Sequence, residues 1–81
     1  MNEYEKIRLI QSQLKTEIQR LMLERGVTRQ GLGSSPKSPL YQVTRQYIAA
    51  VITVHIVYVK AAEELRDWLL TLPRINDDPE A

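Results

Sequence analysis

The spacing of the apolar residues constrains this chain more than any other feature, because it follows the α-helical period over most of the 81 residues. Near the start, Asn2 and Glu5 form a capping-box-like pair, which predicts a helix beginning near Glu3. Gly26 is a natural helix terminator. Between these points the apolar residues recur every three or four positions and so share one helix face: Ile7, Ile10, Leu14, Ile18 and Leu21. The pattern predicts a helix over residues 3–25.

The segment between Gly26 and Ser38 has a different composition, rich in Gly, Ser, Pro and Thr, and it lacks the helical period. Such a composition is typical of a connection, so we expect a loop over residues 26–38. A group of arginines lies near this loop in the sequence. They could contact a phosphate or an acidic partner, although a solvated surface is the simpler interpretation: Arg20, Arg25, Arg29 and Arg45.

A second helix is expected over residues 39–72, because Ser38 and Pro39 favour a helix start and Pro73 favours an end. Residues 51–59 have strand propensity, but the helical period continues through them without a turn residue. Two series with seven-residue spacing predict the seam of an antiparallel helix pair: Leu40, Tyr47, Val54, Ala61 and Trp68, and Val51, Tyr58, Leu65 and Leu72. We therefore expect an all-α, two-helix antiparallel hairpin as a single domain over residues 1–81, with a disordered acidic tail over residues 74–81.

The two helices carry more apolar surface than they can bury against each other. Residues 39–72 would span about 51 Å as a helix and residues 3–25 about 35 Å, so the second helix would extend past the first at its C-terminal end. A symmetric homodimer that forms a four-helix bundle would bury the excess. The residues expected at that interface, or at the interface with a partner protein, are Ile48, Ile52, His55, Val59, Trp68, Leu69, Leu72, Leu9 and Leu23.

Composition argues against chemistry in this chain. It has no cysteine and one histidine, which removes thiol catalysis and Cys-based zinc sites and leaves few ligands for a metal. We expect no catalytic, metal-binding or cofactor-binding residues and no enzymatic activity. The single histidine, His55, is expected to be a hydrogen-bonded interface residue, and a pH-responsive contact remains an alternative.

The net charge of +1 supplies no strong field that would draw the chain to nucleic acid or to an anionic membrane. The apolar run over residues 47–59 is shorter than the roughly 20 residues that span a bilayer. Glu3 and Glu5 occupy the positions where a secretory signal would have basic residues, so a cytoplasmic protein is expected.

A local pattern resembles a known family of regulators. Tyr47, Ile48, Ala50, Ile52 and His55 follow the order Tyr-Ile-x-Ala-x-Ile-x-x-His, and the helix closes with Leu-Pro-Arg-Ile at residues 72–75. This stretch is similar to the C-terminal helix of TraM-type and QseM-type antiactivators. The resemblance implies a homodimer of two long antiparallel helices. It also implies a function in quorum sensing and conjugative transfer control, in which the protein binds and inactivates a LuxR-type transcriptional activator.

Two other classes of protein remain open. Structural or chaperone hairpins of secretion or phage assembly also use two helices around a Pro- and Ser-rich loop. A Rop-like nucleic-acid-binding dimer is the other alternative, and the near-zero net charge argues against it.

Overall fold

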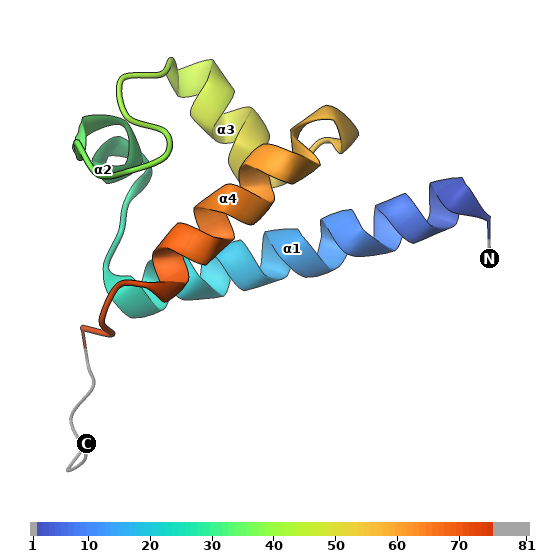
Figure 1. The fold of residues 1–81 in the computed structure, drawn as a ribbon, viewed down its shortest axis with the longest axis horizontal. Coiled ribbons are helices and arrows are strands. Elements are labelled where there is room, and N and C mark those ends of the chain that lie inside the picture. Colours follow the sequence, from blue (N-terminus) through green and yellow to red (C-terminus); the bar gives the residue numbers. More distant parts are fainter. Residues whose placement is uncertain (1, 76–81) are drawn as a thin grey trace, which may run out of the picture.

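The computed structural model describes residues 2–75, and within this range the chain is helical and contains no strand. The elements in chain order are α1 (Glu3–Arg25), α2 (Arg29–Ser34), α3 (Arg45–Thr53), the 3₁₀ turn η1 (Ile56–Tyr58) and α4 (Val59–Leu70) (Figure 1). The all-α class expected from the sequence is confirmed.

The longest helix, α1, has the bounds that the sequence predicts, because local signals set both of its ends. The Asn2 side chain accepts a hydrogen bond from the Glu5 amide at 2.8 Å. At the other end Gly26 has a φ of 66°, a left-handed conformation that glycine adopts without steric cost. The amide of Val27 then donates to the Met22 carbonyl at 2.9 Å, which satisfies one of the free carbonyls of the last turn.

The expected loop over residues 26–38 contains a short helix, α2. Thr28 caps it, because its hydroxyl oxygen accepts a hydrogen bond from the Gly31 amide at 3.0 Å. Leu32 is fully buried and so brings this segment into the core. Gly33 faces α3 at close range, since a Cβ added there would lie 3.1 Å from Cδ1 of Ile48. The absence of a side chain at Gly33 therefore allows α2 to approach α3.

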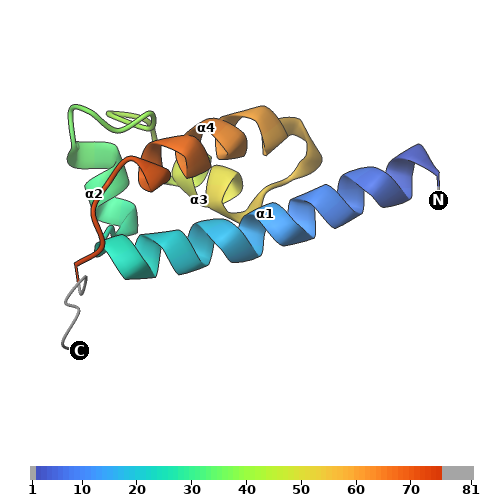
Figure 2. The same ribbon diagram turned by 60° about the horizontal axis from the view of Figure 1, so that its bottom comes forward.

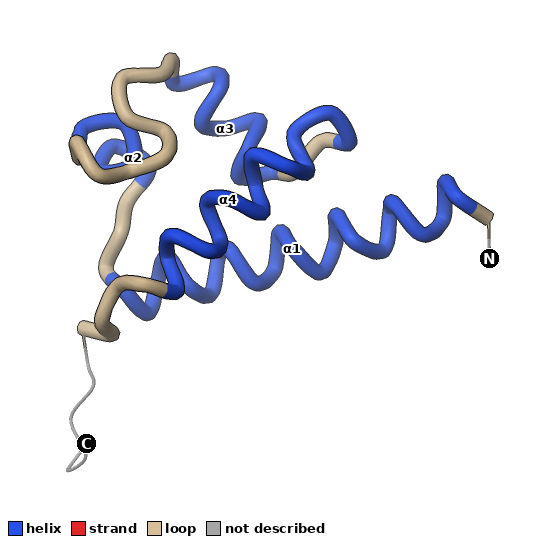
Figure 3. Tube along the Cα trace, viewed as in Figure 1, coloured by secondary structure: helices blue, strands red, loops and turns tan. Residues whose placement is uncertain are grey.

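The expected second helix over residues 39–72 is wrong in its start. Ser38 does not cap a helix; its hydroxyl oxygen accepts from the Leu40 amide at 3.0 Å within a turn. Gln42 has a φ of 61°, and its backbone N–H donates to the Gly33 carbonyl at 2.9 Å. This hydrogen bond holds the loop between α2 and α3 against α2. The helix begins only at α3, where Thr44 accepts a hydrogen bond from the Tyr47 amide at 3.1 Å. Figure 3 shows the resulting loop between α2 and α3.

The second helix is also interrupted at Val54, which lies in the left-handed region with φ 52° and ψ 65°. A β-branched residue adopts this conformation at a cost of about 1–3 kcal/mol. The preceding run of β-branched residues weakens the helix, and the Thr53 hydroxyl bonds back to the Ala49 carbonyl at 2.9 Å. Packing stabilises the corner: the Val54 side chain is 1% exposed, and Nε2 of Gln11 donates to the Val54 carbonyl at 2.7 Å.

The predicted antiparallel hairpin is wrong because α1 and α4 run in the same direction (Figures 1 and 2). Their C-terminal ends meet, since Nε of Arg25 donates to the Leu69 carbonyl at 2.8 Å. Beyond α4, the Ile75 amide donates to the Glu24 carbonyl at 3.0 Å. The interruption at Val54 allows this parallel arrangement. α3 runs opposite to α1, and the change of direction at Val54 then turns the chain so that α4 runs parallel to α1 (Figure 1).

One buried cluster joins all four α-helices. α4 packs along α1 more extensively than any other pair of elements does. The buried apolar residues are Leu14, Ile18, Leu21, Leu32, Leu40, Ile48, Val51, Ile52, Val54, Ala62, Leu65 and Leu69. The tail expected over residues 74–81 is described only at Arg74 and Ile75, which lie against the end of α1; residues 76–81 fall outside the described range.

The parallel direction of α1 and α4 can be tested with a spin label on Leu23→Cys, which introduces the first cysteine into the chain. Leu23 is exposed, so the label leaves the core intact. α4 has 12 residues and spans about 18 Å, enough to separate its two ends. We expect the label to broaden the amide NMR signals of Leu69 and Leu70 more than those of Val59 and Lys60. An antiparallel pair would give the reverse order.

The contact between Gln11 and the Val54 corner gives a second prediction. Gln11→Ala leaves the Val54 carbonyl without this donor and should lower the free energy of unfolding by about 1 kcal/mol. Gln13→Ala is the matched control, because Gln13 is exposed on the same helix; it should change stability by less than about 0.5 kcal/mol. Urea denaturation followed by circular dichroism measures both. Equal midpoints for the two variants would contradict a role of Gln11 at the corner.

Candidate interaction surfaces

Three of the residues expected at an interface lie in the core instead. Ile48 and Ile52 are 5% and 3% exposed, because the interruption at Val54 folds α3 into the centre of the molecule. Leu69 is fully buried, because α4 ends beside the end of α1 rather than extending past its start. The interface assignment of these three residues is therefore corrected: they stabilise the fold of the single chain.

The other expected interface residues keep some or all of their surface. Val59, Trp68 and Leu72 are partly buried and pack against the edge of the core cluster. His55 is exposed and occupies the N-cap position of η1 without a side-chain capping hydrogen bond, so it lies at a corner rather than on an apolar helix face. Its ring lies 6.4 Å from that of Tyr58, centroid to centroid. Leu9 and Leu23 are exposed on α1.

One end of the molecule exposes large apolar side chains on α1 and on η1. The beginning of α1 extends past the other helices in both ribbon views (Figures 1 and 2), and the corner that contains η1 lies at the same end. Exposure reaches 58% at Tyr4 and 81% at Val57. We call this region the arm surface; its residues are Tyr4, Leu9, Ile10, Ile56 and Val57. The helical period places Leu9 on a different side of α1 from Tyr4 and Ile10, so these residues surround the start of the helix rather than forming one face. The overhang expected for the second helix is thus found on α1.

The opposite end exposes a second apolar set where α1 and α4 both finish. Leu23 is 80% exposed, and Ile75 is 61% exposed although its amide bonds to Glu24. We call this region the far-end surface; it comprises Leu23, Leu70 and Ile75, with the partly buried Trp68 and Leu72 on α4 and in the segment after it. Sequence reasoning found Leu23, Trp68 and Leu72. It missed Leu70, because it placed the last helix antiparallel to α1, and Ile75, because it assigned residues 74–81 to a disordered tail.

Three arginines surround the Glu24 carboxylate at the end of α1. The Glu24 carboxylate accepts hydrogen bonds from Nη1 of Arg20 at 3.1 Å and from Nη1 of Arg25 at 2.7 Å, and Nε of Arg74 lies 3.8 Å away. Burial by itself raises the pKa of the Glu24 carboxyl. The hydrogen bond and charge of Arg20, the charge of Arg74 and the hydrogen bond of Arg25 outweigh burial, so the pKa is lowered from its usual 4.5.

Within residues 2–75, no group of three or more histidine or carboxylate side chains is placed to hold a metal ion. No helix in that range combines the length and the apolar character needed to cross a bilayer. The described surface offers apolar contact at its two ends and cationic contact from its arginines.

The comparisons with known proteins give no match: no family model, no curated protein and no solved structure is similar to this chain.

The lowered pKa of Glu24 predicts a pH-dependent contribution to stability. A carboxyl with a lowered folded-state pKa stabilises the fold above its unfolded pKa, near 4.5, and this contribution is lost as the pH falls through the lower folded value. Glu24→Gln should therefore lower the urea midpoint at neutral pH, and the difference from the unchanged chain should shrink below about pH 4.5. Glu64→Gln on the exposed side of α4 is the control. A difference for Glu24→Gln that persists undiminished in acid would contradict the charge cluster.

Proposed function

We propose that this chain is a small protein-binding antiactivator that forms a homodimer and sequesters a LuxR-type transcriptional activator in the cytoplasm. The observation that supports protein binding is the exposure of large apolar residues at two opposite ends of the molecule. Such residues are stabilised when a partner covers them, and each fully covered side chain of this size contributes about 1.5–3 kcal/mol. The choice of an activator as partner rests on the resemblance around Tyr47–His55.

The two surfaces suit two different contacts. In a two-fold symmetric dimer the same patch of both chains meets, and the projecting start of α1 can reach a second copy without obstruction from α3 or α4 (Figure 1). We therefore propose the arm surface as the dimer contact. The far-end surface, which includes Leu23 and Trp68, is then the proposed contact for the activator.

The residues of the resemblance divide between the core and the surface. Ile48 and Ile52 of the Tyr-Ile-x-Ala-x-Ile-x-x-His pattern are buried, so they contribute to the fold rather than to docking. Tyr47 and His55 are exposed. Residues 2–75 do not form the antiparallel two-helix hairpin that the resemblance implies and that the secretion or phage-assembly hairpin and the Rop-like dimer also use. The fold therefore gives none of the three classes specific support, and the proposal rests on the local pattern and the exposed apolar residues.

Three aspartate variants on α1 test the proposal together. Ile10→Asp puts a charge into the arm surface and should convert the dimer into a monomer. Leu23→Asp should leave the dimer intact and weaken binding of the activator by about tenfold, or about 1.4 kcal/mol. Gln13→Asp is the control, because it adds the same charge at an exposed position outside both surfaces and should change neither property.

Light scattering gives the mass, circular dichroism gives the helix content, and a titration with a purified LuxR-type activator gives the affinity. A transcriptional reporter measures repression in cells. Full repression by a helical Leu23→Asp variant would place the activator contact elsewhere. A monomer mass for the unchanged chain at micromolar concentration would remove the homodimer.

A further inference from the structure

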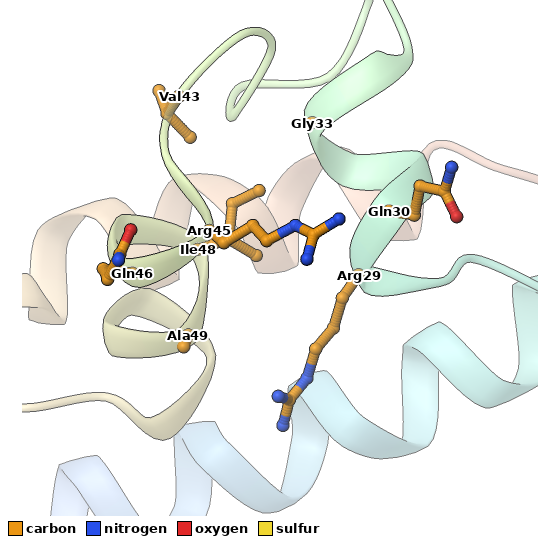
Figure 4. Close-up of a pocket in the computed structure, with 8 residues that line it drawn as sticks. All are labelled: Arg29, Gln30, Gly33, Val43, Arg45, Gln46, Ile48 and Ala49. Carbon is orange, nitrogen blue, oxygen red and sulfur yellow. The ribbon is translucent and has the colours of Figure 1, made fainter.

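A cavity of about 670 Å³ lies between α2 and α3 (Figure 4), within the range of about 300–1,000 Å³ typical of small-molecule sites. It lies on a side of the molecule formed by α2 and α3, and it shares no residue with the arm surface or the far-end surface. Its lining residues on α2 were expected to lie in a loop and those from Val43 to Ala49 in a long second helix, so sequence reasoning gave no indication of a cavity there.

The inner part of the cavity is apolar. Ile48 is almost completely buried, and Val43 and Ala49 are partly buried beside it. Gly33 contributes no side chain on the α2 side, where a Cβ would come within 3.1 Å of Ile48. These groups offer contact to a hydrocarbon body and no hydrogen-bonding side chain.

Two arginines line the same cavity from different helices. Arg29 is the first residue of α2 and Arg45 is the first residue of α3; both are exposed, and no carboxylate is among the lining residues. In Figure 4 the Arg45 side chain reaches across toward α2, the Arg29 side chain extends from α2 toward α1, and the amide groups of Gln30 and Gln46 point away. Within residues 2–75 neither arginine forms an ion pair, unlike Arg20, Arg25, Arg66 and Arg74.

We propose that this cavity binds a small organic carboxylate, whose apolar body lies against Val43, Ile48 and Ala49. Its charged group pairs with Arg45, and with Arg29 once that exposed side chain rotates toward the cavity. Guanidinium groups match carboxylates in charge and geometry, and each can donate two parallel hydrogen bonds. The apolar inner part adds contact that a simple inorganic anion or acetate could not use. The proposal does not depend on the antiactivator function, because the cavity uses none of the residues of the arm surface or the far-end surface.

Sodium octanoate is the probe, with octanol and acetate as matched controls that lack the charge and the apolar body, respectively. Titration of the ¹⁵N-labelled chain with octanoate should shift the amide signals of Gly33, Val43 and Ala49. The affinity derived from these shifts should be at least about tenfold weaker for either control. Arg29→Gln and Arg45→Gln should each weaken octanoate binding about fivefold. Lys37→Gln removes the same charge from an exposed position outside the cavity and should leave the affinity unchanged.

Ala49→Leu provides a variant that keeps both charges and fills the cavity; it should abolish octanoate binding while circular dichroism shows unchanged helix content. Equal binding of octanol and octanoate, or shifts confined to the exposed apolar residues of α1, would overturn the proposal. So would an affinity that falls equally with Lys37→Gln and Arg45→Gln. An acetylated tripeptide with a free carboxyl end is a further probe: binding of this peptide without binding of octanoate would mean that the cavity recognises a protein chain end and not a small molecule.

Discussion

The packing of α4 along the C-terminal half of α1 is the contact on which the other elements depend. Leu14, Ile18 and Leu21 form a stripe on α1, and Ala62, Leu65 and Leu69 form the matching stripe on α4, all of them buried. A short chain buries a limited share of its surface, so this seam supplies much of the hydrophobic stabilisation available. α2 and α3 add Leu32, Ile48, Val51 and Ile52 to the same cluster.

The corner at Val54 shows how this seam imposes a conformation that the local sequence disfavours. A left-handed valine is costly, yet its buried side chain and the hydrogen bond from Gln11 offset the cost. Arg25 fixes the other end of α4 through the Leu69 carbonyl. The side chains of Gln11 and Arg25 on α1 thus bond to main-chain carbonyls at Val54 and at Leu69. These two hydrogen bonds fix the start and the end of the segment that contains η1 and α4.

Local signals predicted those parts of the fold that depend on neighbouring residues. Asn2 and Gly26 set the ends of α1 directly, and the apolar periods predicted buried residues such as Leu14, Val51 and Leu65. The corner escaped prediction because it contains neither Gly nor Pro, and the β-branched run before it was outweighed by the continuous helical period. α2 was not predicted because its segment is rich in Gly and Ser, a composition that favours a loop.

The candidate surfaces could be predicted only in part, because a helical stripe indicates which residues are buried but not the direction of the partner helix. With α4 parallel to α1 instead of antiparallel, Leu69 moves into the core, and Leu70 and Ile75 become part of an exposed end. The cavity between α2 and α3 depends on tertiary placement of Arg29 and Arg45, which are far apart in sequence and carry no common motif.

The parallel arrangement of the first and last helices also determines when this protein can fold. The hydrogen bonds that join α1 to the second half of the chain close loops of 43 and 44 residues, more than half of the chain length. Until α4 has been synthesised, the apolar stripe of α1 lacks its most extensive partner, and an isolated helix of this length is only marginally stable in water. The core therefore forms after translation of α4, in one step that joins distant segments, and folding is slower than for a hairpin of adjacent helices. A prematurely terminated product would expose the whole α1 stripe and become a substrate for chaperones or proteases.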